Sequence, residues 1–130
     1  MKSKKDEVRE KLRKIFEGGH RKFILYPYGE YGKITKDLLN NEFGIEEIAI
    51  LDNQGDEEKI KTLSWLKDRK IESDEYILIT SVNPDIYGEI RANVKEYVDE
   101  KNILDMFSEK NIQYTMMNSK SIWQIGEGWI

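Results

Sequence analysis

Apolar residues follow two patterns along the chain, one with helical spacing and one of short continuous runs. Val8, Leu12 and Ile15 recur three or four residues apart with charged residues between them, until Gly18 and Gly19 end the pattern. This spacing predicts an amphipathic helix over residues 6–17. The short runs are nearly continuous in hydrophobicity, which predicts strands covered on both faces, as in a parallel sheet. They comprise residues 23–26, 48–51, 76–79 and 103–106.

The segments between these runs carry apolar residues at helical spacing. The helix after the first run is predicted to end near Asn40 and Asn41. Another helix is predicted to begin at Asn83-Pro84, because asparagine is a preferred cap and proline a preferred first helical residue. The predicted buried stripes are Tyr31, Ile34, Leu38 and Leu39 after the first run, Ile60, Leu63 and Leu66 after the second, and Ile86, Ile90, Val94 and Tyr97 or Val98 after the third.

Strands and helices therefore alternate through most of the chain, and such alternation implies right-handed crossovers between parallel strands. The predicted fold is α/β: a Rossmann-like three-layer sandwich, with a mostly parallel sheet of four to five strands and helices on both faces. The length of 130 residues is that of one domain. Within it we expect an N-terminal helix in residues 1–19, a nucleotide-binding-like core in residues 22–107, and an edge strand or tail in residues 108–130.

The last stretch breaks this alternation. Residues 112–116 are predicted as a further strand at the sheet edge, and an apolar tail follows them. The tail either packs back onto the domain or forms a docking surface for another copy of the chain or for a catalytic partner domain, because exposed tryptophans are costly. Its apolar residues are Ile122, Trp123, Ile125, Trp129 and Ile130.

Composition and charge narrow the functional classes. Hydrophobic residues make up 38% of the chain and charged residues 35%, yet seven Tyr, four Phe and three Trp argue against disorder. The net charge of −4 comes from interleaved acidic and basic residues, without the basic stripe of a nucleic-acid-binding protein. No apolar run approaches the ~20 residues that span a bilayer, and the amino terminus lacks the order of a secretory signal. We therefore expect a cytoplasmic location and neither nucleic-acid nor membrane partners.

The residues suited to metal binding and nucleophilic catalysis are few. The chain has no cysteine, which excludes disulfides, thiolate nucleophiles and cysteine-bound metals. The single histidine, His20, cannot build a multi-histidine metal site, and it is expected in a solvated loop. The acidic cluster around Gly55 lacks the alternating ligand spacing of a calcium loop, so we predict helix capping and solvated charge there, and no metal site. This cluster consists of Asp52, Asp56, Glu57 and Glu58.

The turn after the first strand resembles a dinucleotide fingerprint. The fingerprint reads G-x-G-x-x-G, and its three glycine positions here hold Pro27, Gly29 and Gly32. Gly29 lacks a Cβ, so that a phosphate could approach the backbone, while Gly32 would let the helix pack closely on the strand. Pro27 removes the freedom of the first glycine, so the turn must differ from the usual one. The alternative is that both glycines serve only the turn geometry.

Two acidic residues bear on this site in opposite ways. Asp52 ends the second strand 23 residues after Gly29, close to the ~20-residue spacing at which the fingerprint places an acid that binds ribose hydroxyls. Glu30 lies inside the turn, where its charge suits the helix dipole but would repel a pyrophosphate unless the side chain points away. The sequence thus favours a nucleotide-type site with an altered phosphate clamp.

Residues 23–33, followed by residues 48–53, resemble the Rossmann-like domains of bacterial sugar and surface-polysaccharide biosynthesis proteins. Such domains are attached to sugar acetyltransferases, FkbM-type methyltransferases and glycosyltransferases. The resemblance covers about residues 22 to 107 and implies NAD(P) or a nucleotide-sugar as ligand, with the chemistry in a partner domain. Pro27 departs from the pattern, and no acetyltransferase repeat follows. The candidate ligand-binding residues are Tyr28, Gly29, Glu30, Tyr31, Gly32, Asp52, Asn53, Thr80, Ser81 and Asn83.

The last three of these residues follow the third strand, at the edge where open α/β sheets bind ligands. Ser81 has no histidine nearby in sequence to form a hydrolytic triad, and Asn83 alone is better explained as a helix cap. Three hypotheses remain: a nucleotide-binding accessory module, a small NAD(P)-dependent oxidoreductase or transferase subunit, and a purely structural or oligomerising module. The second would need Tyr26, Tyr28 or Tyr31 as its proton donor, and no catalytic residue is assigned.

Overall fold

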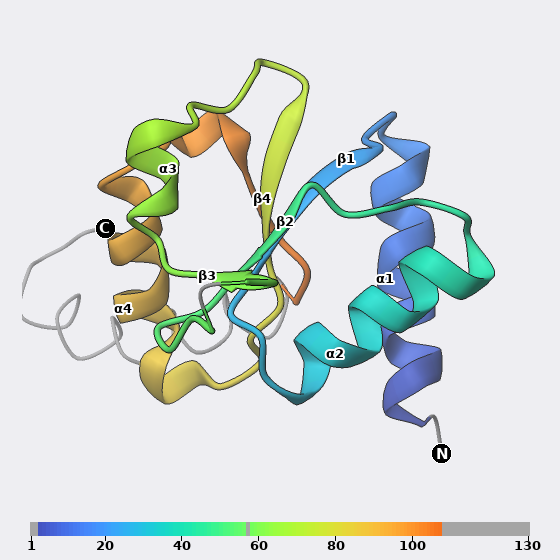
Figure 1. Cartoon of the computed structure of the whole chain (residues 1–130). Coiled ribbons are helices and arrows are strands. Elements are labelled where there is room, and N and C mark those ends of the chain that lie inside the picture. The colour runs from blue at the N-terminus through green and yellow to red at the C-terminus, as the bar shows by residue number, and fades with distance from the viewer. Residues whose placement is uncertain (1–2, 57, 108–130) are drawn as a thin grey trace, which may run out of the picture.

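The structure is a computed structural model that describes residues 3–56 and 58–107. Its centre is a five-stranded, all-parallel sheet with the strand order β3-β2-β1-β4-β5, flanked by helices on both faces (Figure 1). This arrangement confirms the predicted Rossmann-like three-layer sandwich. In chain order the elements are α1 (Lys4–Glu17), β1 (Lys22–Tyr26), α2 (Glu30–Asp37), a π-helical turn (Leu38–Glu42), β2 (Ala49–Leu51), β3 (Ile60–Lys61), α3 (Trp65–Asp68), β4 (Glu75–Ile79), α4 (Pro84–Lys95), a 3-10 turn (Glu100–Asn102) and β5 (Ile103–Asp105).

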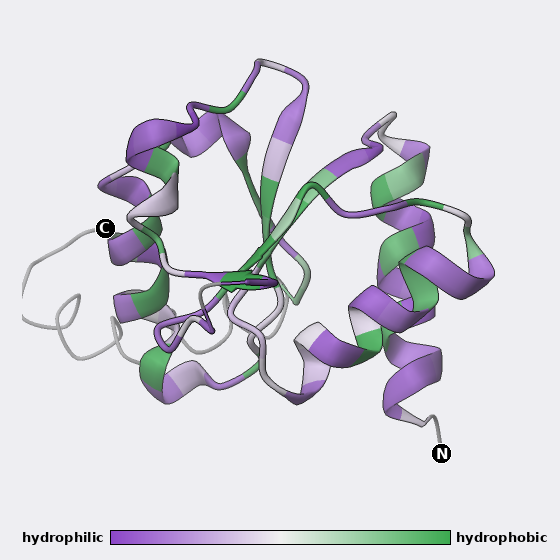
Figure 2. Ribbon diagram, in the orientation of Figure 1, coloured by the Kyte–Doolittle hydropathy of each residue, from purple (hydrophilic) through white to green (hydrophobic). Residues whose placement is uncertain are grey.

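The central strand β1 supplies side chains to both faces of the sheet, because successive residues of a strand point in opposite directions. Phe23 and Leu25 face α1 and α2, whereas Ile24 and Tyr26 face α3 and α4, and all four are buried. This explains the continuous hydrophobicity of the run. Figure 2 shows the same division in the helices, whose apolar residues face the sheet and whose polar residues face outward.

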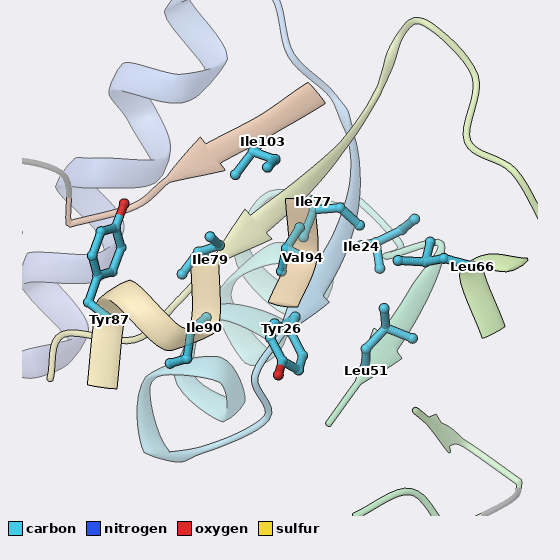
Figure 3. Close-up of a cluster of buried hydrophobic side chains, with 10 residues drawn as sticks. All are labelled: Ile24, Tyr26, Leu51, Leu66, Ile77, Ile79, Tyr87, Ile90, Val94 and Ile103. Atoms are coloured by element: carbon cyan, nitrogen blue, oxygen red, sulfur yellow. The ribbon is translucent and has the colours of Figure 1, made fainter. Parts of the chain in front are cut away.

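Two separate apolar clusters hold the layers together. The cluster under α1 and α2 includes Val8 and Leu12 of α1, both fully buried. The cluster under α3 and α4 is drawn in Figure 3, where Leu66 of α3 and Val94 of α4 approach the strands. Burial of each such side chain contributes roughly 1.5–3 kcal/mol to folding.

One predicted helix is mostly wrong. Ile60 was expected on a helical stripe, but it lies in β3, which pairs in parallel with β2. The segment between β2 and β3 holds no described helix, and α3 is confined to Trp65–Asp68. Asp56 accepts hydrogen bonds from the backbone N–H groups of Glu58, Lys59 and Ile60 at 3.0, 2.8 and 2.7 Å, and these bonds close a tight turn that leads into the strand.

The buried face of α4 also differs from the prediction. Asn83 caps the helix as expected, with its side-chain oxygen accepting from the backbone N–H of Asp85 at 2.9 Å. However, Ile86 is 43% exposed, and Tyr87 takes the buried place beside Ile90. Both apolar choices fit helical spacing, and the packing against β4 and β5 decides between them.

Several predictions concern residues that the structure does not describe. The strand expected at 112–116 and the tryptophan-containing tail both lie outside the described residues. Among the helices within the described ranges, none has the length and apolar character needed to cross a bilayer.

Candidate functional site

The candidate site lies where the chain leaves the carboxyl ends of β1 and β4. The connection from β1 leads through α2 to β2 on one side, while β4 pairs with β1 on the other side. Neighbouring strands whose connections run in opposite directions leave a crevice at their carboxyl ends, and open α/β proteins bind ligands there. In Figure 1 the starts of α2 and α4 lie at this same end of the sheet.

The turn between β1 and α2 is locked against β4. The hydroxyl of Thr80 donates a hydrogen bond of 2.8 Å to the carbonyl of Pro27. A Cβ added at Gly32 would lie 2.6 Å from that same carbonyl oxygen, closer than any normal contact. Gly32 therefore allows a close approach of the helix to the turn and to Thr80, whereas the sequence predicts close packing of the helix on the strand. The Tyr26-Pro27 peptide bond is cis.

The first turn of α2 is open. Gly29 is its N-cap and provides no side-chain hydrogen bond, and the first backbone bond into the helix runs from Lys33 N to the Gly29 carbonyl at 3.0 Å. A Cβ added at Gly29 would meet nothing within 4 Å. By contrast, Ser3 and Asn83 cap α1 and α4 with their side chains. The N-terminus of α2 thus keeps its partial positive charge without a capping side chain.

A cavity of about 210 Å³ opens beside this turn, between α2 and the loop from β4 to α4. The polar side chains of that loop are engaged within the protein: Ser81 Oγ accepts from Asn83 N at 3.2 Å, and Asn83 Oδ1 caps α4. Seven of the ten sequence-predicted residues line the cavity, together with Pro27, Val82 and Ile86. The seven are Gly29, Glu30, Tyr31, Gly32, Thr80, Ser81 and Asn83.

The other three predicted residues lie on the β2 side of the turn. Asp52 Oδ1 accepts a hydrogen bond of 3.1 Å from the backbone N–H of Tyr28, and Asn53 Oδ1 accepts one of 2.9 Å from the hydroxyl of Tyr26. Burial, followed by the nearby charge of Asp52, raises the pKa of Tyr26. Tyr26 is thus a buried hydrogen-bond donor and not an accessible acid. Tyr28 lines a separate cavity of about 310 Å³ above β2 and β3.

The carboxylate of Glu30 is paired with a residue that the sequence analysis did not place at the site. Lys4 of α1 donates to Glu30 Oε1 at 2.8 Å, and the same ammonium lies 6.0 Å from the ring centroid of Tyr31. The hydrogen bond and the charge of Glu30 raise the pKa of Lys4. No sequence signal pointed to Lys4, because the contact joins residues 26 positions apart through the packing of α1 on α2.

The carboxyl end of β5 is occupied by internal contacts. Both oxygens of Asp105 accept from Arg91 Nη1, at 3.0 and 2.8 Å, and the second nitrogen of Arg91 donates to Glu100 at 3.1 Å. Burial and a hydrogen bond to Asp105 raise the pKa of Tyr87 well above its usual value. These residues connect α4 to β5, and they add no ligand-binding group to the cavity.

The remaining reactive residues are also engaged in local structure. His20 lies in the loop between α1 and β1, as predicted, but it is half-buried there and packs edge-on against Tyr76, with ring centroids 4.3 Å apart. Within the described ranges, no group of three acidic, histidine or cysteine side chains is placed to hold a metal ion.

The arrangement at the cavity suits binding through backbone N–H groups and apolar contacts. No family model, no curated protein and no solved structure matches this chain.

Proposed function

We propose that this protein binds a nucleotide, either NAD(P) or a nucleotide-sugar, at the carboxyl edge of its sheet. The observation that carries the proposal is the cavity beside the uncapped first turn of α2, at the position where the connections that follow β1 and β4 run in opposite directions. The phosphate would lie over Gly29, and the ribose hydroxyls would point towards Asp52.

The phosphate part of the proposal rests on the backbone of α2. A helix N-terminus offers N–H groups and a partial positive charge to an anion. Gly29 has no side chain to block the approach of an anion. The space that a Cβ would occupy there is also empty, with nothing within 4 Å. The cavity of about 210 Å³ is smaller than the ~300–1,000 Å³ of whole small-molecule sites. It therefore suits the phosphate and one adjoining group, with the nucleoside lying over the strand ends.

The ribose part rests on Asp52. One of its oxygens holds the backbone N–H of Tyr28 at 3.1 Å, which fixes the carboxylate next to the turn. A carboxylate has about four acceptor positions, so Asp52 retains the capacity to accept ribose hydroxyls. The apolar residues Val82 and Ile86, which line the cavity, would contact the uncharged part of the ligand.

The biological setting that we propose is an accessory module in sugar or cell-surface polysaccharide biosynthesis, which acts with a catalytic partner. The resemblance of residues 23–33 and 48–53 to such domains supports this setting. The engaged side chains around the cavity agree with binding as the role of the chain itself.

Isothermal titration calorimetry with NAD+, NADP+, UDP-glucose, CDP-glucose and GDP-mannose tests the proposal. We expect at least one of these ligands to bind at millimolar concentration or below. Gly29→Ala should weaken that binding at least tenfold, because the new methyl group blocks the close phosphate approach. Asp52→Asn should also weaken it, because the amide keeps an acceptor for Tyr28 N but loses the charge and half of the acceptor capacity.

Gly88→Ala is the matched control, because Gly88 lies in α4, away from the cavity lining, and its added Cβ also meets nothing within 4 Å. It should leave ligand affinity unchanged. If none of the five ligands binds to the wild-type chain, the proposal of a nucleotide site is wrong, and a structural or oligomerising role becomes the better explanation.

A further inference from the structure

The first turn of α1 reaches the rim of the candidate site. Lys4 Nζ lies 2.8 Å from Glu30 Oε1 and 6.0 Å from the ring centroid of Tyr31, and both of these residues line the cavity. A lysine in the first turn of a helix is unfavourable to that helix, whose dipole is positive at this end. Lys4 therefore gains little within α1, and among the described residues it contacts Glu30 and Tyr31 of α2.

The charges around the cavity give Lys4 a role. Among the ten lining residues Glu30 is the single charged one. An anion that approaches the N-terminus of α2 would meet this carboxylate, and like charges at contact distance repel each other. The ammonium of Lys4 has three donors, of which Glu30 takes one, so it can hold the carboxylate and a phosphate oxygen together.

We infer that Lys4 is the cationic residue of the ligand site and bridges Glu30 to a phosphate of the ligand. The inference rests on the proposed nucleotide site. It makes α1, which precedes the first strand, a part of that site. The side chains of Lys4 and Glu30 are 54% and 63% exposed, so both can adjust to a ligand without repacking the core.

Lys5 provides a matched control. It lies next to Lys4 in α1, its side chain is 53% exposed, and it also pairs with an acid of α2, Asp37, at 3.4 Å. Asp37 does not line the cavity. Lys4→Ala and Lys5→Ala therefore remove the same charge from the same helix turn, and only the first removes it from the site.

The binding of ADP, UDP, CDP and GDP to the wild type is first measured by calorimetry at low salt. The nucleotide that binds tightest and its nucleoside are then titrated into each variant. We expect Lys4→Ala to weaken binding of the diphosphate about five- to twentyfold, and Lys5→Ala less than twofold. Lys4→Arg should retain most of the affinity. The matching nucleoside should bind the wild type and Lys4→Ala equally, because it carries no phosphate.

Glu30→Gln tests the bridge itself. It should tighten diphosphate binding severalfold by removing the repelling charge, and Lys4→Ala should still weaken binding in that background. Equal effects of Lys4→Ala and Lys5→Ala would overturn the inference while leaving the nucleotide site in place. So would a loss of the Lys4→Ala effect in the Glu30→Gln background. Failure of all four nucleotides to bind a wild-type chain that binds one of the five larger ligands would overturn this inference alone, whereas failure of all nine ligands would overturn the proposed function as well.

Discussion

At the scale of single residues, the turn after β1 places two glycines under different demands. A Cβ added at Gly32 would meet the carbonyl of Pro27 and the hydroxyl of Thr80, whereas one added at Gly29 would meet nothing within 4 Å. Neither glycine has a positive φ, so the conformational freedom of glycine is not what the turn uses. Gly32 is needed for packing, whereas packing places no such demand on Gly29, and its backbone is open to the approach of a ligand.

Gly32→Ala should destabilise the fold by about 1–3 kcal/mol, because its methyl group would lie 2.6 Å from a backbone oxygen that cannot move independently. Gly29→Ala should change the free energy of unfolding by less than about 1 kcal/mol. Urea denaturation followed by circular dichroism measures both. Equal stability of the two variants would show that the contact at Gly32 relaxes without cost.

At the scale of elements, α4 shows how packing decides between alternatives that the sequence leaves equal. Ile86 and Tyr87 are neighbours at the start of the helix, and both continue the spacing of Ile90. The structure buries Tyr87 and leaves Ile86 43% exposed at the cavity. An apolar side chain exposed beside a cavity is consistent with a ligand contact, whereas Ile90 belongs to the core.

We expect Ile86→Ala to cost less than about 0.5 kcal/mol of stability and Ile90→Ala about 2–4 kcal/mol. Thermal or chemical denaturation of the two variants checks the orientation of α4. A large loss for Ile86→Ala would mean that the helix is rotated relative to this structure. If a nucleotide binds, Ile86→Ala should weaken its binding without a matching loss of stability.

The sequence predicts the four apolar strands and the cap at Asn83, because burial on both faces and capping are local properties of the chain. It does not predict β3, since Ile60 also fits a helix, and its pairing with Ile50 depends on a turn held by Asp56. For the same reason it cannot place Lys4 beside Glu30. That contact exists only once α1 has packed on α2.

At the scale of the whole molecule, acid stability should depend on an ion pair at the start of β4. Glu75 is buried, and its two oxygens accept from Arg69, one of them from Nη2 at 2.9 Å. The hydrogen bond from Arg69 lowers the pKa of Glu75 below its ordinary value of 4.5, against the opposing effect of burial. Because this pKa is lower in the folded chain, the unfolded chain binds more protons at pH values around the two pKa values of Glu75.

The stability from Glu75 is therefore present above about pH 4.5 and lost as the pH falls through the folded-state pKa. Glu75→Gln should lower the free energy of unfolding by roughly 1–3 kcal/mol at pH 7 and by less at pH 3. The free energy of unfolding of the variant should therefore fall less steeply in acid than that of the wild type. Urea denaturation at several pH values measures this difference. Glu100→Gln, whose side chain is 64% exposed, serves as the control with a small effect at pH 7. A constant cost of Glu75→Gln across the pH range would contradict the assignment.

The central place of β1 also governs when the chain can fold. Its most extensive partner is β4, with five registered residue pairs, and the bond that locks the β1 turn joins Thr80 to Pro27, 53 positions away. During synthesis β1 therefore emerges with both edges unpaired. It can complete its pairing only after β4 has left the ribosome. Loop closures of this length slow folding, and an unpaired apolar strand is prone to aggregation. Fragments that end before β4 should accordingly be recovered as aggregates, whereas fragments that end after β5 contain every strand described here.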